Sequence, residues 1–132
     1  MRGWIGVDLD GTLAHYDRWR GIDHIGEPIA PMLSRVKRWL AEGRDVRIFT
    51  ARIEAGTVRH GNEIIVRNEV KNVAETIRHI QNWTELHLGV RLPVTNRKDN
   101  EMLELWDDRA VQVERNTGRR MDSEPDPEHW TP

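Results

Sequence analysis

The run VDLDGTL at residues 7–13 constrains the fold and the chemistry of this chain more than any other feature. It follows an apolar stretch at residues 4–7 that is typical of a buried strand, and Gly11 then ends the strand. Because side chains alternate between the two faces of a strand, we expect Asp8 and Asp10 to point the same way and Leu9 to point into the protein. Two neighbouring carboxylates at a strand end are unfavourable without a positive partner. The run therefore predicts a divalent metal, and a metal beside a second carboxylate suggests phosphoryl chemistry.

Composition excludes several classes of protein. The 132 residues are enough for one domain with its own core, and the absence of cysteine excludes disulfide and thiolate chemistry. A net charge of -2 gives no sign of a protein that binds nucleic acid over its whole surface, although it does not exclude a local basic patch. No apolar run is long enough to span a membrane, and the first strand begins too early for a signal peptide. We therefore expect a cytoplasmic protein without a membrane partner.

Apolar patterning predicts that strands and helices alternate along the chain. The expected strands are residues 3–9, 46–49 and 92–95, with a weakly indicated strand around 103–107 and another at 110–113 before a turn at 116–118. Pro31 fits the first turn of a helix that Gly43 would cap, and Asn62 could cap a longer helix. Such an alternation is typical of an α/β domain with a parallel sheet and right-handed crossovers. The longer helix would carry one apolar stripe, formed by Val66, Val70, Val73, Ile77 and Ile80.

Three segments fit this alternation less regularly. Residues 11–28 carry glycines, a proline and a cluster of aromatic and arginine side chains, which indicates an irregular excursion or a small hairpin. Residues 100–105 are expected to form a short helix or turn. The proline- and acid-rich residues 121–132 are expected to be a weakly ordered tail, so that residues 1–120 form a single domain.

Polar residues follow the expected strands at the edge where α/β proteins bind ligands. The carboxylates there can hold Mg²⁺ together with phosphate and water oxygens, and one of them can attack phosphorus while a second moves protons. Lys98 can supply the positive charge, and Thr50 a hydrogen-bond donor, that a transferring phosphoryl group needs. The residues of this predicted site are Asp8, Asp10, Thr50, Lys98, Asp107 and Asp108.

Four short motifs resemble those of the haloacid dehalogenase-like (HAD) phosphatase superfamily. Residues 8–12 (DLDGT) resemble the first motif, residues 49–52 (FTAR) the second, Lys98 the third and residues 106–109 (WDDR) the fourth. They occur in the family's order and span residues 4 to about 115. The resemblance implies a three-layer Rossmann-like α/β domain with a central parallel sheet. It also implies a Mg²⁺-dependent phosphomonoester hydrolase that acts through an aspartyl-phosphate intermediate.

The resemblance implies a role for each motif residue. Asp8 would be the nucleophile and a metal ligand, and Asp10 the general acid and base with its backbone carbonyl on Mg²⁺. Thr50 would bind the transferring phosphoryl group, and Lys98 would connect that group to the nucleophile. The remaining residues implied for the site are Asp108 as a direct metal ligand, Asp107 as a ligand or a residue behind the ligands, and Gly11, Thr12, Ala51 and Arg52 around the substrate.

The resemblance also narrows the chemistry and the kind of substrate. An aspartate at position 10 favours phosphatase or phosphotransferase chemistry, because dehalogenases of this superfamily lack an acid there and its ATPases carry threonine. The short stretches at residues 13–45 and 52–98 leave no room for the large cap domain of many members. A capless site is open, which suits a phosphate on a polynucleotide end or a protein, or on a small molecule if a second copy of the chain covers the site. Residues 50–52 and 107–109 also resemble the phosphatase half of polynucleotide kinases and small 5′-nucleotidases.

Several of these residues also have a purely structural interpretation. Thr50 could simply end a strand, and the acids at residues 107–108 could lie at the start of a helix. Arg52 could be a surface charge rather than a phosphate contact. Lys98 lies in a polar run where Arg97 could replace it as the phosphate-binding cation.

The residues just beyond the first motif are the expected segment for substrate recognition. Aromatic and arginine side chains together can stack on a base and hold a phosphate, although Trp19 could instead pack under the loop. The residues of this expected flap are Tyr16, Arg18, Trp19 and Arg20. As an alternative function, the chain could be a phosphate-sensing or interaction module that keeps a HAD-like pocket and turns over little substrate.

Overall fold

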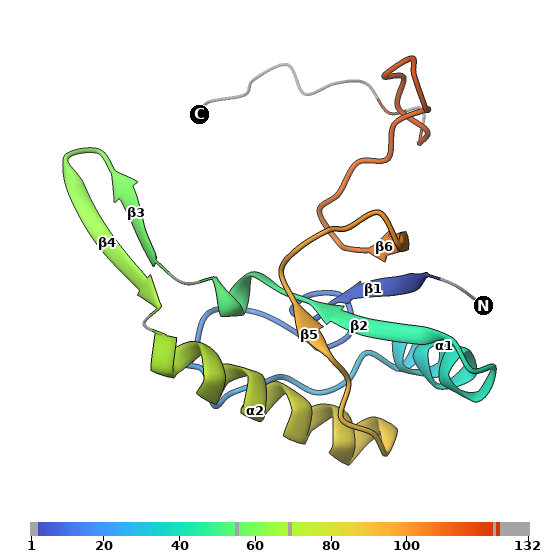
Figure 1. The fold of residues 1–132 in the computed structure, drawn as a ribbon, viewed down its shortest axis with the longest axis horizontal. Helices are drawn as coiled ribbons and strands as arrows, with labels where there is room; N and C mark the ends of the chain where they lie inside the picture. The colour runs from blue at the N-terminus through green and yellow to red at the C-terminus, as the bar shows by residue number, and fades with distance from the viewer. Residues whose placement is uncertain (1–2, 55, 69, 123, 125–132) are drawn as a thin grey trace.

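The computed structural model describes residues 3–54, 56–68, 70–122 and 124. Figure 1 shows the order of the elements along the chain. The strands are β1 (Trp4–Asp8), β2 (Asp45–Phe49), β3 (Gly56–His60), β4 (Glu63–Asn68), β5 (Val94–Thr95) and β6 (Met102–Trp106). The helices are α1 (Ala30–Ala41), the short 3₁₀ helix η1 (Ala51–Ile53) and α2 (Val70–Leu88).

Four of the strands form a parallel sheet in the order β5-β2-β1-β6. Strand β1 lies between β2 and β6. The carboxyl ends of the four strands therefore lie at one edge of the sheet, where Asp8 pairs in register with Phe49 of β2. The fold is thus α/β with a central parallel sheet, which confirms this part of the predicted fold class.

One face of the sheet forms the hydrophobic core together with both helices. Ile5 and Val7 of β1 and Ile48 of β2 are fully buried there, in one cluster with Val36 of α1 and Ile80 of α2. Figure 1 shows α1 and α2 on the same side of the sheet. Burial of each such side chain stabilises the fold by about 1.5–3 kcal/mol. This face therefore holds the central strand, and with it the first motif, in place.

The other face of the sheet is crossed by residues 96–101, which connect β5 to β6 without a helix. Trp4 alternates with Ile5, and its Nε1–H donates a hydrogen bond of 2.8 Å to Asp99 in this connection. The Arg47 guanidinium lies 4.6 Å from the centre of the Trp4 ring, and its Nη1 lies 3.9 Å from Asp99 Oδ2. The connection that carries Lys98 is therefore anchored to β1 and β2.

Helix α1 agrees with its prediction from sequence. Pro31 lies in its first turn, and Met32, Val36 and Trp39 are buried at a spacing of four and then three residues. Gly43 follows the helix with a φ of +79°, in the left-handed region that favours glycine. The helix thus ends where the glycine lets the chain turn toward β2.

The prediction that Asn62 caps a long helix is wrong. Residues 56–68 form an antiparallel hairpin of β3 and β4, whose strands are joined by the two-residue turn Gly61-Asn62. Gly61 has a φ of +64°, which suits such a turn. A Gly-Asn pair between two segments rich in β-branched residues favours a hairpin, and this outweighs the helical spacing that starts at Val66. Helix α2 begins only at Val70, and the hairpin extends away from the sheet (Figure 1).

Helix α2 still carries the last part of the predicted apolar stripe. Ile80 is fully buried, and Val73 and Ile77 are half-buried. Trp83 is also buried, and its Nε1–H donates a hydrogen bond of 3.1 Å to the carbonyl of Gly26. The helix thus connects the core to the segment that follows the first motif.

Two predictions for the C-terminal third need correction. Residues 102–106 form β6, so the expected short helix or turn is limited to a turn at residues 100–101, and the weakly indicated strand around 103–107 is confirmed. Residues 110–113, all of them described, form no strand, and Val113 makes only an isolated bridge to Arg120. Val111 and Val113 are 49% and 52% exposed, so this segment would gain little from apolar burial in a sheet. The predicted turn at 116–118 is present, with Asn116 at a φ of 66°.

The expected tail lies almost wholly outside the described residues, which include only 121, 122 and 124 of residues 121–132. Within the ranges that the structure describes, no helix has the length and apolar character needed to cross a membrane.

Candidate functional site

Three carboxylates gather at the carboxyl edge of the sheet. Asp8 is the last residue of β1, and Asp107 and Asp108 directly follow β6, the strand that pairs with β1. One carboxylate oxygen of each residue lies within 4.8 Å of the others. We call these three residues the acid cluster. These are the residues predicted to hold a metal through their side chains, whereas Asp10 was expected to bind it through its backbone carbonyl.

The surroundings of Asp8 raise the pKa of its carboxyl to about 7. Burial contributes most, followed by the hydrogen bond with Asp108 and the negative charges of Asp107 and Asp108. The Thr12 hydroxyl donates a hydrogen bond of 3.3 Å to Asp8 Oδ2 and acts in the opposite direction. A nearby cation would therefore stabilise the charged form of Asp8.

The donor set of the acid cluster fits Mg²⁺. This ion prefers hard oxygen ligands, and the three aspartates offer only carboxylate oxygens. A divalent cation among them would offset the like charges that raise the pKa of Asp8. Gly11, with a φ of +86°, lets the chain pass close to Asp108. The cluster would hold the ion, with the backbone carbonyl of Asp10 as a further ligand predicted from sequence.

Asp10 has surroundings that differ from those of Asp8. Both of its carboxylate oxygens accept hydrogen bonds from Arg52, with Nε 2.7 Å from Oδ2 and Nη2 2.8 Å from Oδ1. Strand β1 ends at Asp8, so the alternation that predicted a common direction for the two acids does not extend to Asp10. The predicted burial of Leu9 between them is confirmed. The Asp10 side chain is thus held by a guanidinium and not by the acid cluster.

Arg52 connects three parts of the site. Its side chain is only 5% exposed, so it is not a surface charge. Besides binding Asp10, its Nη2 donates a hydrogen bond of 3.0 Å to the carbonyl of His24, and its guanidinium lies 5.0 Å from the centre of the Trp19 ring. These contacts join the end of β2 to Asp10 and to residues 11–28. A contact between Arg52 and a substrate phosphate stays a prediction.

Thr50 lies at the end of β2, as predicted, and it is buried. Its Oγ1 accepts a hydrogen bond of 3.1 Å from the N–H of Arg52 and so caps η1, in which Ala51 is the exposed first residue. The N–H of Thr50 donates a hydrogen bond of 3.0 Å to the carbonyl of Thr95 in β5. Thr50 therefore has the structural role that its position suggested, at the end of β2. Because a hydroxyl can accept and donate at the same time, Thr50 can also donate to a phosphoryl oxygen.

Residues 11–28, called the excursion from here on, form a small hairpin, which was one of the two expectations. Ala14 in the first leg bridges Pro28 in the second, and the N–H of His15 donates a hydrogen bond of 2.8 Å to the carbonyl of Glu27. A Cβ atom on Gly26 would lie 2.0 Å from the carbonyl oxygen of His15. Only glycine lets the two legs lie this close together.

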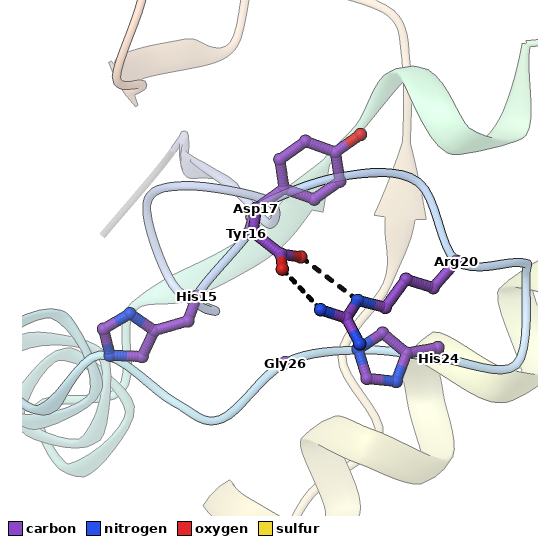
Figure 2. Close-up of a pocket in the computed structure, with 6 residues that line it drawn as sticks. All are labelled: His15, Tyr16, Asp17, Arg20, His24 and Gly26. Carbon is purple, nitrogen blue, oxygen red and sulfur yellow. Dashed lines mark hydrogen bonds and ion pairs between the residues drawn. The ribbon is translucent and has the colours of Figure 1, made fainter.

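The excursion lines a pocket of about 390 Å³. Figure 2 shows that the Asp17 carboxylate faces the Arg20 guanidinium across part of its wall. The hydrogen bond from Arg20 lowers the pKa of Asp17 to about 2, so the charge of Arg20 is balanced by a neighbour. The residues that line the pocket are His15, Tyr16, Asp17, Arg20, His24 and Gly26.

The four residues of the expected flap have different surroundings. Tyr16 and Arg20 line the pocket, whereas Arg18 is exposed. Trp19 is 53% exposed and covers Arg52, so it does not pack beneath the loop as the structural interpretation proposed. A contact between these residues and a substrate stays a prediction.

Lys98 and Arg97 lie on the exposed connection between β5 and β6. Among the described residues, no hydrogen bond or ion pair joins the Lys98 ammonium to Asp8 or to any other side chain. The Arg97 side chain is exposed as well, while its N–H donates a hydrogen bond of 3.1 Å to Thr95 Oγ1. Both residues remain candidates for the phosphate-binding cation.

Sequence reasoning did not find the partner of Asp10. Arg52 is 42 residues away in the chain, and no local spacing connects the two. His24 was also missed, because it contributes a backbone carbonyl that any residue type could supply. The indication available in the sequence was the position of Arg52, two residues after the strand-end Thr50.

Comparison with known proteins adds little to this site. No family model matches the sequence, and no curated protein matches it. Among solved structures, the chain is similar to a conserved protein from Bacteroides thetaiotaomicron, with 20% sequence identity and a TM-score of 0.48. The match covers 84% of this chain and 79% of that chain.

Proposed function

We propose that this protein is a Mg²⁺-dependent phosphomonoester hydrolase of the HAD type that acts through an aspartyl-phosphate on Asp8. The observation that carries the proposal is the separation of two acids that are close in sequence. Asp8 lies in the acid cluster with Asp107 and Asp108, whereas Asp10 is held by Arg52. One carboxylate thus lies where a metal and a phosphoryl group would be bound, and the second lies outside the cluster, as suits a proton carrier.

The acid cluster would hold the metal. When bound, Mg²⁺ supplies positive charge to the phosphoryl oxygens and offsets the charge of Asp8 and its neighbours. The donors around the phosphoryl group would be the Thr50 hydroxyl and the backbone N–H of Ala51, the residue after it. Lys98 or Arg97 would add positive charge to them.

The reaction has two displacement steps. In the first, a carboxylate oxygen of Asp8 attacks phosphorus while the bond from phosphorus to the leaving oxygen breaks, and Asp10 gives its proton to that oxygen. In the second, Asp10 takes a proton from water, whose oxygen attacks the same phosphorus. The Asp8–phosphorus bond then breaks, which releases phosphate and restores both carboxyl groups.

The proposed substrate is a phosphorylated small molecule or the phosphorylated end of a polynucleotide. The excursion pocket lies next to Arg52 through His24 and offers a phenol ring and two imidazoles, which can pack against a flat aromatic group such as a nucleobase. A second copy of the chain could cover the site of a small substrate. We propose that the protein acts in the cytoplasm without a membrane partner.

Hydrolysis of 4-nitrophenyl phosphate by the purified protein tests the proposal. We expect turnover that requires Mg²⁺ and disappears with EDTA, because the acid cluster holds three carboxylates that need a cation. Asp8→Asn removes the nucleophile and should lower kcat by at least about 10³-fold. Asp10→Asn should lower kcat by about 10²–10⁴-fold with this substrate, because no base remains to take the proton from the water that hydrolyses the intermediate.

A matched control is Asp45→Asn, which changes an aspartate at the opposite end of β2 and should leave turnover unchanged. Equal activity of the wild-type protein and Asp8→Asn would contradict the proposal. Stable phosphorylation of Asp8 without release of phosphate would instead support a phosphate-sensing module.

A further inference from the structure

We infer that Arg52 is a positioning residue that orients the Asp10 carboxylate for proton transfer and connects it to the wall of the excursion pocket. The inference rests on the proposed function, because it gives Arg52 a part in the proton transfer assigned to Asp10. The two-point contact between the side chains carries it, with Nε 2.7 Å from Oδ2 and Nη2 2.8 Å from Oδ1.

This two-point contact fixes the plane of the Asp10 carboxylate. A guanidinium binds both oxygens at once, whereas an ammonium can bind the carboxylate only as a point charge. Each carboxylate oxygen has a second lone pair, so the contact leaves a position for the proton that Asp10 carries. Arg52 is itself held in place, because its side chain is only 5% exposed and its N–H bonds Thr50 Oγ1 at 3.1 Å. Asp10 is thereby fixed to the end of β2.

A role for Arg52 as a ligand of the substrate phosphate predicts a different result from a positioning role. The Nε and Nη2 of Arg52 are directed at Asp10 and at the His24 carbonyl, and Asp10 already balances its charge. A phosphate ligand would contribute to substrate affinity, whereas a positioning residue contributes to the rate of proton transfer. Loss of the two-point contact should therefore lower kcat without raising KM.

Arg52 also links Asp10 to the excursion pocket. His24 lines that pocket and accepts a hydrogen bond of 3.0 Å from Nη2, while the Trp19 ring covers the guanidinium at 5.0 Å. The buried Arg52 side chain thus contacts both the pocket wall and the Asp10 carboxylate. A leaving group held in the pocket would lie near the carboxyl that protonates it.

The chain offers a matched control in Arg47. Its Nε and Nη2 lie 3.3 and 2.9 Å from the carboxylate oxygens of Asp45, and its guanidinium lies 4.6 Å from the centre of the Trp4 ring. Arg47 therefore has the same kinds of contact as Arg52, on the opposite face of the sheet from the core and away from Asp10. Arg47→Lys tests what loss of such a contact costs when the surroundings of Asp10 are unchanged.

The experiment compares leaving groups of different acidity. Wild-type protein, Arg52→Lys, Arg52→Gln, Arg47→Lys and Asp10→Asn are mixed with 4-nitrophenyl phosphate or with an alkyl phosphate in the presence of Mg²⁺. Release of the leaving group in a single turnover is followed by rapid acid quench, and KM is measured at steady state. Circular dichroism and thermal unfolding report folding. Arg52→Lys keeps the buried positive charge and decides the outcome if Arg52→Gln does not fold.

We expect Arg52→Lys to resemble Asp10→Asn in its dependence on the leaving group. Release of the alkyl alcohol should fall about 10²-fold, because a poor leaving group needs a correctly placed acid. Release of 4-nitrophenol should fall less than about threefold, since this group leaves without a proton. KM should not rise, and Arg47→Lys should keep the wild-type ratio of the two rates.

Three results would overturn the inference. A raised KM with an equal loss for both substrates would make Arg52 a phosphate ligand. An equal loss for both substrates at constant KM, matched by Arg47→Lys, would make its role structural. Rates like those of the wild-type protein would remove its role altogether. An inactive wild-type protein would instead contradict the proposed function, and the role of Arg52 would fail with it.

Discussion

Gly11 approaches Asp108 so closely that a Cβ atom on the glycine would lie 2.5 Å from Asp108 Oδ2. The φ of Gly11 is +86°, in a region that other residues rarely adopt. The backbone of the first motif is thus packed against an acid of the fourth motif. The geometry of the acid cluster therefore requires that residue 11 has no Cβ atom.

Gly11→Ala is expected to lower the free energy of unfolding by about 1–3 kcal/mol and to reduce the stabilisation by Mg²⁺, because Asp108 has to move. Urea unfolding with Mg²⁺ and with EDTA measures both effects. Gly43→Ala is the matched control, because Gly43 has a φ of +79° and a Cβ atom added there would meet no other atom within 4 Å. It should lose stability while keeping the full response to Mg²⁺, and an equal Mg²⁺ response in both variants would contradict the prediction.

The raised pKa of Asp8 predicts how stability changes with pH in the absence of metal. Between its ordinary pKa of 3.8 and about 7, Asp8 binds more protons in the native protein than in the unfolded chain. The stability that Asp8 contributes through this difference is fully present below pH 3.8. It is lost as the pH rises through the native pKa of about 7. In EDTA, Asp8→Asn should therefore gain stability relative to the wild-type protein as the pH rises.

Urea unfolding of the two proteins from about pH 4 to about pH 8 checks this prediction. The difference in free energy of unfolding between them should grow with pH in EDTA. Mg²⁺ should reduce or reverse that difference, because the ion compensates the ionised cluster. A difference that does not depend on pH would show that Asp8 has an ordinary pKa.

Lys98→Ala is expected to lower kcat/KM for a phosphate monoester more than Arg97→Ala does. The two cations are neighbours on the same exposed connection, so each serves as the control for the other. The prediction follows from the resemblance of Lys98 to the third HAD motif, and loss of one charge at a phosphoryl group should cost about 10²-fold. A larger loss of kcat/KM in Arg97→Ala would show that Arg97, and not Lys98, is the phosphate-binding cation.

The parts of the fold that depend on short-range patterns could be predicted from sequence. Strand β1 is a continuous apolar run, and α1 has buried residues at helical spacing between a proline and a glycine. The place of Asp8, Asp107 and Asp108 followed from the rule that ligands bind at the carboxyl ends of parallel strands. Each of these inferences needs only neighbours in sequence or a rule of topology.

Other parts depend on information that such patterns do not contain. The spacing from Val66 to Ile80 fits one helix, but Val66 lies on β4 and only the later residues lie on α2. Strand β6 was weakly indicated because Glu104 interrupts its apolar run. The contact between Asp10 and Arg52 joins residues 42 positions apart and requires the folded chain.

The most direct measurement is the mass of the intact protein after rapid acid quench of a reaction with 4-nitrophenyl phosphate and Mg²⁺. Asp10→Asn is the protein to use, because loss of the general base slows hydrolysis of the intermediate and lets it accumulate. We predict an added mass of one phosphoryl group, located on Asp8 by peptide analysis and absent from Asp8→Asn/Asp10→Asn. A phosphoryl group on another residue, or release of 4-nitrophenol without any adduct at any quench time, would contradict a covalent mechanism through Asp8.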